Sequence, residues 1–457
     1  MELPPEVAVV MVPLPCQSHL NQLLQLSIQM VSYGLPVHYI GSATHNRQAK
    51  LRTHGLKPKA MSKIQFHDLP TPPIAAPEPD PTSLNKVPVH LWPATEAYMN
   101  LRQPIHSLLE ELSSKTRRTV IIYDRMVSEA VRDAVLLPNA ESYAFNCLSA
   151  FNLFFILWEA MEKPFKVEGE LRHISSMKGF IPEAALDFIV SNTIEERAGD
   201  IHNTSIVIDK TYLDLMAREE ISGKKQQWAI RPSLPTNFSS KNGTESRHKC
   251  LKWLDKQAPR SVIYVSFGTT TSLTDEEARE LAMGLEQSKQ KFLWVLRDAD
   301  KADIFAGEAR RIELPQGFEE RVKEDGMVVR DWAPQLEILA HESTGGFMSH
   351  CGWNSCFESI AMGVPIAAWP MHSDQPLNAI FLTEILGIGL LVREWAQREE
   401  LVKMSTIEDV VKRLIASKEG DEIRQKAEQL SHEINHSVGE GGESNRELDS
   451  FVAHITR

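Results

Sequence analysis

The stretch that decides the fold spans residues 332–375 and reads WAPQLEILAHESTGGFMSHCGWNSCFESIAMGVPIAAWPMHSDQ. Its pattern predicts a buried strand over 346–349, a short loop of small and polar residues, and a helix over 356–362. A helix N-terminus directly behind a strand binds phosphate, because its first backbone N–H groups are free and the helix dipole favours negative charge. The stretch therefore predicts an α/β fold with a phosphate site at this loop.

The side chains around the loop suit the other parts of a sugar nucleotide. The flat indole of Trp332 can stack on a base. Glu358 lies four residues after Asn354, on the same helix face, and its carboxylate can accept hydrogen bonds from both hydroxyls of a ribose. Further along the chain, Asp374 and Gln375 suit the vicinal hydroxyls of a hexose. These residues indicate a site for a nucleoside diphosphate sugar.

The same stretch resembles the signature box of the plant secondary-product UDP-glycosyltransferases along its whole length. The positions that match the family's spacing are Trp332, Gln335, His341, Gly346, His350, Gly352, Asn354, Ser355, Glu358, Gly363, Pro365, Asp374 and Gln375. So many matches at fixed spacing make this a specific signature.

The resemblance implies a role for each part of the box. For the nucleoside it implies stacking of uracil on Trp332, help from Ala333 and Gln335, and ribose binding by Glu358. For the phosphates it implies His350, Asn354 and Ser355, and for the transferred sugar it implies Trp353, Asp374 and Gln375. The final Gln favours glucose and leaves xylose open. We expect UDP-glucose as the co-substrate, with no metal and no other cofactor.

Two residues of the first half suit the chemistry of sugar transfer. His19 follows the first predicted strand in PLPCQSHLNQLLQLS, which resembles the family's Pro-x-Gln-Gly-His motif with Ser18 in place of Gly. Asp124 lies at the end of an apolar strand, and ligands of open α/β sheets bind beyond the carboxyl ends of the strands. We expect neutral His19 to take the acceptor's proton while Asp124 orients the ring, in a single displacement that inverts the anomeric centre.

Structural roles are alternatives for the same residues. A histidine near a strand is often a cap or a surface residue, an aspartate after a strand often caps the next helix, and Arg125 can redirect the Asp124 carboxylate. Thr269 is expected beside the diphosphate together with Thr270, although threonine at a strand end is also a turn former. The His and Cys residues of 341–372 lack metal-ligand spacing, so zinc is not expected.

The length and the rhythm of the chain predict two domains. A chain of 457 residues exceeds the usual size of one hydrophobic core. Strands and helices alternate in both halves, which predicts two Rossmann-like, doubly wound parallel sheets, and the resemblance implies the GT-B arrangement in which they face a cleft. We expect residues 1–240 to bind the acceptor and 241–439 to bind the UDP-sugar, with a polar linker over 232–248. A helix over about 440–457 is expected to pack back onto the first domain.

Composition limits the classes of partner and the cellular compartment that we expect for this protein. The formal net charge of −12 disfavours nucleic acid and anionic membrane surfaces as partners. The five cysteines lack paired spacing, the N-terminus lacks a basic leader, and no apolar stretch reaches the length of a membrane span. We therefore expect a cytoplasmic protein without membrane association, a monomer whose partners are a UDP-sugar and a small hydroxylated acceptor.

Other stretches resemble the zeatin O-glucosyltransferases within the family. They are FHDLPTPP at 66–73, RHKCLKWLDKQ at 247–257, VIYVSFGTTTSLT at 262–274 and the tail ELDSFVAHITR at 447–457. This resemblance implies transfer of glucose from UDP-glucose to the side-chain hydroxyl of zeatin, a cytokinin, or transfer of xylose from UDP-xylose as in close relatives. A flavonoid or phenolic acceptor is the alternative, because residues 201–238 match less well.

Two classes of protein are less compatible with the sequence. A dinucleotide-dependent oxidoreductase would carry Gly-x-Gly-x-x-Gly after its first strand, and this chain does not. An inert binder of sugar nucleotides would not need His19 and Asp124. The sequence therefore favours an enzyme.

Overall fold

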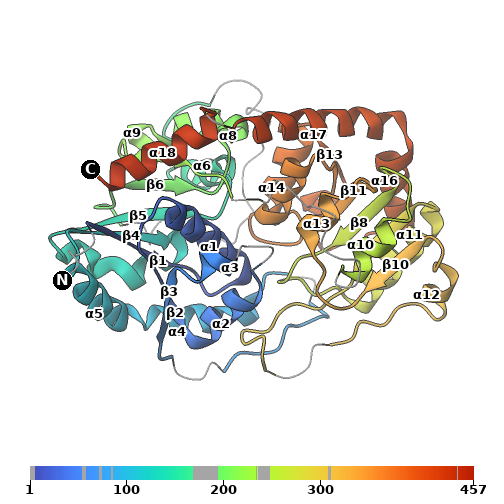
Figure 1. Cartoon of the computed structure of the whole chain (residues 1–457). Helices are drawn as coiled ribbons and strands as arrows, with labels where there is room; N and C mark the ends of the chain where they lie inside the picture. Colours follow the sequence, from blue (N-terminus) through green and yellow to red (C-terminus); the bar gives the residue numbers. More distant parts are fainter. Residues whose placement is uncertain are drawn as a thin grey trace.

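The computed structural model describes residues 6–53, 58–71, 75–83, 86–167, 194–232, 234, 247–306, 310–439 and 441–457. Their strands form two separate parallel sheets (Figure 1). The predicted domain boundary at 240/241 and most of the predicted linker lie outside the described residues. Among the described helices, none combines the length and apolarity that crossing a bilayer requires.

The first sheet has seven strands in the order β3-β2-β1-β4-β5-β6-β7. These strands are β1 (Val7–Val12), β2 (Val37–Ser42), β3 (Ile64–Leu69), β4 (Arg118–Asp124), β5 (Ala140–Asn146), β6 (Gly199–His202) and β7 (Gln226–Ala229). All six residues of β1 are buried, as expected for an apolar run in a parallel sheet covered by helices. The strand order reverses between β1 and β4, so the carboxyl ends of these two strands form the switch point where ligands bind.

The second sheet has six strands in the order β10-β9-β8-β11-β12-β13. They are β8 (Val262–Ser266), β9 (Lys291–Val295), β10 (Gly326–Val329), β11 (Thr344–Ser349), β12 (Ile366–Ala368) and β13 (Gly389–Leu391). Here the order reverses between β8 and β11. The prediction of two doubly wound parallel sheets is confirmed.

The helices connect and cover these strands. In the first half they are α1 (Gln17–Ser32), α2 (Ala43–Leu51), α3 (Pro58–Met61), η1 (Val89–Leu91), α4 (Trp92–Met99), α5 (Arg102–Ser113), η2 (Arg125–Leu136), α6 (Ala150–Ala160), α8 (Ile206–Met216) and α9 (Glu219–Ser222). In the second half they are α10 (Lys249–Leu254), α11 (Asp275–Ser288), α12 (Phe318–Arg321), α13 (Gln335–Leu339), α14 (Trp353–Met362), α15 (Gln375–Ile380), η4 (Phe381–Ile385), η5 (Trp395–Gln397), α16 (Met404–Ala416), α17 (Lys418–His436) and α18 (Glu443–Ile455).

The last helix, α18, returns to the first sheet, although α17 before it packs on α14 and α16 of the second half (Figure 1). Phe451 and Ile455 of α18 are buried in the core of the first sheet. The Phe451 ring lies 5.4 Å from the Tyr143 ring on β5 and 5.2 Å from the Trp228 ring on β7. The C-terminus thus completes the core of the domain in which the chain begins.

Candidate active site

A cavity of about 1500 Å³ is lined by residues of both halves of the chain. Every residue predicted for the site lies along it. These residues are His19, Asp124, Thr269, Trp332, Ala333, Gln335, His350, Trp353, Asn354, Ser355, Glu358, Asp374 and Gln375. The carboxyl ends of the strands in the two sheets therefore contribute to one site.

The predicted phosphate loop joins β11 to α14. Gly352 is the N-cap of α14. Because glycine has no side chain, the free backbone N–H groups of the first turn are not capped from this position. Asn378 supports the loop, because its Nδ2 donates to the carbonyl of Cys351 at 2.8 Å. Asn354 and Ser355 lie in the first turn of α14, because this helix begins at Trp353, three residues before the predicted start. This arrangement suits an anion.

The imidazole of His350 packs between two glycines. A Cβ placed on Gly268 or on Gly352 would come within 2.5 Å of His350 Nε2, so neither position has room for a larger residue. Gly268 also has a φ of +73°, which glycine adopts without strain. Burial lowers the pKa of His350 to about 4, so the ring is neutral near pH 7 and can donate one N–H to an oxygen.

The part of the cavity predicted to bind the nucleoside contains an oriented carboxylate. Gln335 Nε2 donates to Glu358 Oε2 at 2.8 Å and to Ser355 Oγ at 3.0 Å. Burial raises the pKa of Glu358 to about 7, and the hydrogen bond from Gln335 opposes that rise. Trp332 is 44% exposed and stands nearly perpendicular to the ring of His248, at 6.1 Å. Ala333 lies beside it on the cavity wall.

The residues predicted for the sugar are held by internal hydrogen bonds. Gln375 Oε1 accepts from the backbone N–H groups of Met371 and His372 at 2.9 and 3.0 Å. Asp374 Oδ2 accepts from Asn378 Nδ2 at 2.7 Å, and burial raises the pKa of this carboxyl. Both side chains are thus fixed in place before a ligand arrives.

Trp353 and Asn354 also connect the two halves of the chain. The indole of Trp353 is buried and its Nε1 donates to the carbonyl of Asn203 at 2.7 Å, so the ring itself serves the domain contact. Asn354 Nδ2 donates to the carbonyl of Ser18 at 3.1 Å, and Asn354 Oδ1 accepts from Gln22 Nε2 at 2.5 Å. The phosphate loop therefore contacts α1 of the first half directly.

Thr269 follows β8 at the edge of the cavity. Its carbonyl accepts from the backbone N–H of Asp300 at 2.7 Å, and the neighbouring Thr270 Oγ1 lies 3.1 Å from His372 Nε2. Both threonines thus have structural partners and also line the cavity. Their positions are compatible with both roles considered for them, beside the diphosphate and in a turn at the strand end.

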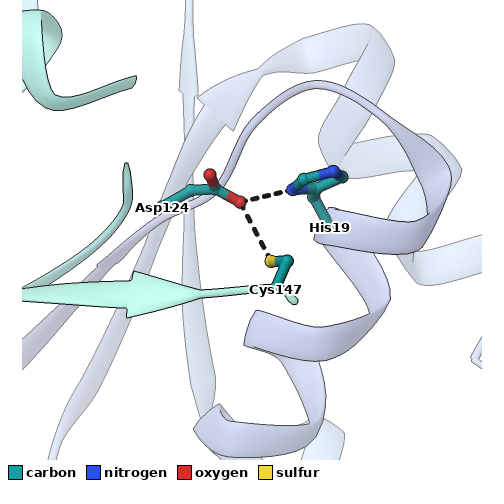
Figure 2. Close-up of side chains that lie close together, drawn as sticks. All are labelled: His19, Asp124 and Cys147. Atoms are coloured by element: carbon teal, nitrogen blue, oxygen red, sulfur yellow. Dashed lines mark hydrogen bonds and ion pairs between the residues drawn. The ribbon is translucent and has the colours of Figure 1, made fainter. Parts of the chain in front are cut away.

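His19 and Asp124 form a hydrogen-bonded pair, with 2.6 Å between Nδ1 and Oδ2 (Figure 2). The hydrophobic pattern of the sequence predicts a helix from about Leu20, whereas α1 begins at Gln17, so that His19 lies in its first turn. Asp124 ends β4, and its Oδ1 accepts from the N–H of Met126 at 3.0 Å as the N-cap of η2. The capping role and the histidine contact therefore use different oxygens of the same carboxylate.

The electrostatics of this pair favour a charged aspartate. Burial favours protonation of Asp124, but His19 and the surrounding hydrogen-bond donors outweigh burial and lower the pKa of the carboxyl. Burial disfavours the imidazolium of His19, yet attraction to Asp124 raises its pKa on balance. Because Nδ1 donates to the carboxylate, Nε2 is the nitrogen that can accept a proton. Arg125 donates instead to Asn146 and Asp200, at 2.6 and 2.7 Å.

Cys147 was not predicted to belong to the site, but the structure places it against this pair. Its Sγ lies 3.1 Å from Asp124 Oδ2 (Figure 2). Among the described residues, His19, Asp124 and Cys147 are also of metal-ligand type and hold their ligand atoms within 4.8 Å of one another. The strand register indicates this contact. Phe145 of β5 pairs with Asp124 of β4, so Cys147, which follows β5, lies at the same edge of the sheet.

Comparison with known proteins agrees with this geometry. The model of the glycosyltransferase N-terminal domain matches residues 5–235, and the model described as "UDP-glucoronosyl and UDP-glucosyl transferase" matches residues 170–417. The chain belongs to the UDP-glycosyltransferase family. Members of this family are transferases, so the prediction of an enzyme is confirmed.

Two plant enzymes are half identical to this family member. The zeatin O-glucosyltransferase of Phaseolus lunatus is 50% identical over 455 residues, which covers 99% of this chain and 97% of that enzyme. The zeatin O-xylosyltransferase of Phaseolus vulgaris is also 50% identical over 455 residues, covering 99% and 98%. The predicted resemblance to zeatin O-glycosyltransferases is thus confirmed.

The fold of this UDP-glycosyltransferase also matches solved structures. Phytolacca americana UGT2, solved with UDP-2-fluoro-glucose and pterostilbene, superimposes with a TM-score of 0.80 at 27% identity, covering 99% of this chain and all of that one. The predicted GT-B arrangement is confirmed.

Proposed function

We propose that this enzyme transfers glucose from UDP-glucose to the side-chain hydroxyl of zeatin, with inversion at the anomeric carbon. One observation carries the proposal: a histidine–aspartate pair and an open phosphate loop line the same cavity, in a chain half identical to zeatin O-glycosyltransferases. The pair supplies a base, and the loop supplies a place for the leaving diphosphate.

The proposed reaction is a single displacement. The acceptor hydroxyl gives its proton to Nε2 of His19 while its oxygen forms a bond to the anomeric carbon. The bond from that carbon to the β-phosphate oxygen breaks, and UDP leaves with the electron pair. Asp124 stabilises the imidazolium that results, because its carboxylate lies 2.6 Å from Nδ1. Attack opposite to the leaving group turns an α-linked donor into a β-glycoside.

The donor half of the cavity would bind UDP through backbone and side chains. The N-terminus of α14 and the neutral ring of His350 face the phosphates in this proposal, and Glu358 accepts from the ribose hydroxyls. Trp332 stacks on uracil. Asp374 and Gln375 are left to contact the sugar, since both line the cavity in fixed positions.

The acceptor half has walls that suit a flat, largely apolar ring. The apolar residues that line it are Leu14, Val87, Leu91, Met126, Phe145, Leu148, Leu153 and Ile156. Among the phenylalanines of this region, Phe145 lines the cavity, whereas Phe151, Phe154 and Phe155 are buried in a core cluster. A ring bound against this wall can direct a side-chain hydroxyl towards His19.

Xylose is the second candidate for the transferred sugar. The zeatin O-xylosyltransferase of Phaseolus vulgaris is as similar to this chain as the glucosyltransferase is, at 50% identity each. We propose glucose because the box ends in Gln375. We further propose that the enzyme works as a cytoplasmic monomer, in keeping with five free cysteines and a net charge of −12.

The test is a matrix of two donors and several acceptors. Purified protein is incubated with UDP-glucose or UDP-xylose and with trans-zeatin, cis-zeatin, dihydrozeatin or flavonols, and products are identified by mass spectrometry and anomeric coupling constants. We expect a zeatin O-β-glucoside. Products from flavonols alone would overturn the zeatin acceptor, and faster xylosyl transfer would overturn glucose. UDP release without any acceptor product would contradict transferase function on these substrates.

A further inference from the structure

Cys147 contacts Asp124 of the proposed acid–base pair (Figure 2) and also the helix that carries His19. It follows β5, is buried, and directs Sγ to Oδ2 of Asp124 at 3.1 Å. Its carbonyl accepts from Nε2 of Gln22 at 3.3 Å, and Gln22 lies on α1, one turn after His19. Cys147 is therefore tied to the carboxylate through its side chain and to the histidine's helix through its backbone.

The thiol acts as a hydrogen-bond donor in this contact. An ionised carboxylate only accepts hydrogen bonds, so the proton between Cys147 and Asp124 belongs to sulfur. Burial, reinforced by the charge of Asp124, raises the pKa of the Cys147 thiol well above its usual value. The group therefore stays protonated near neutral pH, and it is a poor nucleophile there.

Asp124 Oδ2 consequently receives two donors. One is His19 Nδ1–H at 2.6 Å and the other is the thiol at 3.1 Å, while Oδ1 receives the N–H of Met126 at 3.0 Å. Three donors fix the rotation of the carboxylate. The two donors on Oδ2 also share its negative charge, so the thiol reduces the charge available to stabilise the imidazolium of His19.

We propose that Cys147 is a positioning residue that holds the Asp124 carboxylate and sets the basicity of His19 through it. This inference rests on the proposed function, in which His19 is the general base. Without the thiol, Oδ2 would interact more strongly with His19, and the imidazolium would be more stable. A larger fraction of the enzyme would then hold a protonated, inactive base at a given pH.

The test compares Cys147→Ala, which removes the donor, with Cys147→Ser, which keeps one. The pH profile of kcat/KM is measured for zeatin at saturating UDP-glucose. We expect the acid limb of Cys147→Ala to move to higher pH by about half a unit or more, and that of Cys147→Ser to stay near the wild-type position. The KM for UDP-glucose should not change. Cys250→Ala, which removes a buried thiol of the second half, is the matched control and should leave the limb in place.

A second measurement does not depend on turnover. The S–H stretching band of Cys147, assigned by subtracting the infrared spectrum of Cys147→Ser, should lie at the lower frequency of a hydrogen-bonded thiol. Replacing Asp124 by Asn should move that band. A free-thiol band insensitive to Asp124→Asn would overturn the inference, and so would an acid limb that Cys147→Ala leaves unchanged.

The outcomes separate this inference from the proposed function. If His19→Ala keeps near-normal turnover, the proposed general base is wrong, and the role of Cys147 fails with it. If His19→Ala is inactive while Cys147→Ala changes only the acceptor KM, His19 remains the base and Cys147 is merely part of the cavity wall. Thermal unfolding and UDP binding are recorded for each variant, so that an effect of misfolding is not mistaken for a shift of the acid limb of the kcat/KM profile.

Discussion

The two sides of the cavity are built in different ways. The side of the second sheet comes mostly from one continuous stretch, 332–375, whose loop, helix and following strand all reach the cavity. The side of the first sheet collects His19 from α1, Asp124 from the end of β4 and Cys147 from the end of β5. A binding surface can thus be concentrated in one segment, while a proton-transfer group depends on three segments meeting at a sheet edge.

This difference predicts which substitutions should change the binding affinity and which should change the rate. In the proposed function, many groups on the side of the second sheet bind the donor together, so losing one should weaken affinity moderately. On the first-sheet side, the proposal assigns the chemistry to one hydrogen-bonded chain, so losing one member should affect the rate more than the affinity. Five variants examine this contrast.

The largest effect is expected for His19→Ala. Removal of the general base should lower kcat by about 10²- to 10⁴-fold, because positioned proton transfer contributes roughly that factor. The dissociation constant of UDP, measured by calorimetry, should stay within about twofold of the wild type. Near-normal turnover would contradict the expected difference between the two sides of the cavity.

Asp124→Asn should come next. The amide keeps an oxygen for the N–H of Met126 but presents a donor or a weaker acceptor to His19, which disturbs the tautomer. We expect kcat to fall by about 10²-fold and the pKa of His19 to drop, because the charge that raises it is gone. The acid limb of the kcat/KM profile should accordingly move to lower pH; a limb moving upwards would contradict the ion-pair account.

Trp332→Ala examines the donor side. Stacking of a base on an aromatic ring contributes about 1–3 kcal/mol, so UDP should bind roughly 5- to 150-fold more weakly. At saturating donor, kcat should remain close to that of the wild type. Trp332→Phe keeps a flat ring and serves as the control, with most of the affinity expected to return.

Glu358→Gln should reveal a pH dependence of binding. Burial raises the pKa of Glu358 to about 7, and ribose hydroxyls need the ionised carboxylate, so UDP binding should release a proton. Wild-type affinity should therefore be highest above pH 7 and decrease below it, by at most about tenfold per unit. The Gln variant should bind about tenfold more weakly at pH 8 and lose this dependence. A pH-independent wild type would show that Glu358 does not take the ribose.

Gln22→Ala should have the smallest effect, because it removes only two neutral hydrogen bonds, one of which crosses between the two sides. Its amide bonds Asn354 Oδ1 and the carbonyl of Cys147. One neutral hydrogen bond contributes about 1 kcal/mol, so the donor KM should rise by roughly two- to fivefold. A double-mutant cycle with Asn354→Ala measures the coupling directly, and strictly additive effects would argue that the contact does not matter for binding.

The two sides of the cavity also differ in how much of each could be predicted from the sequence. The fold and the donor loop could be predicted, because hydrophobic periodicity marks strands and a phosphate loop is local in the chain. The start of α1 at Gln17 was missed, since no side chain caps that helix. The sequence Thr274-Asp275-Glu276-Glu277 predicts a capping box for α11, and both of its hydrogen bonds between Thr274 and Glu277 are present.

Apart from the His19–Asp124 pair, the side-chain contacts between distant parts of the chain were not predicted. Nothing in one sequence tells that the indole N–H of Trp353 is taken by Asn203, or that a thiol 23 residues from Asp124 shares its oxygen with His19. Such contacts depend on strand order and register, which set β4 beside β5 and α14 against α1. The physical cause is that these partners are neighbours only after the sheets have formed.

The return of α18 to the first sheet has a consequence for protein engineering. The backbone N–H of Ala229 donates to Glu447 of this helix at 3.1 Å, and Arg457 pairs with Glu141 on β5 at 2.9 Å. The half that contains the first sheet, which we propose binds the acceptor, is thus assembled from two non-contiguous pieces of chain. A chimera designed to exchange acceptor preference between relatives needs two crossover points, one near the middle and one before residue 443. A single-crossover hybrid would leave a foreign helix in the core of the transplanted domain.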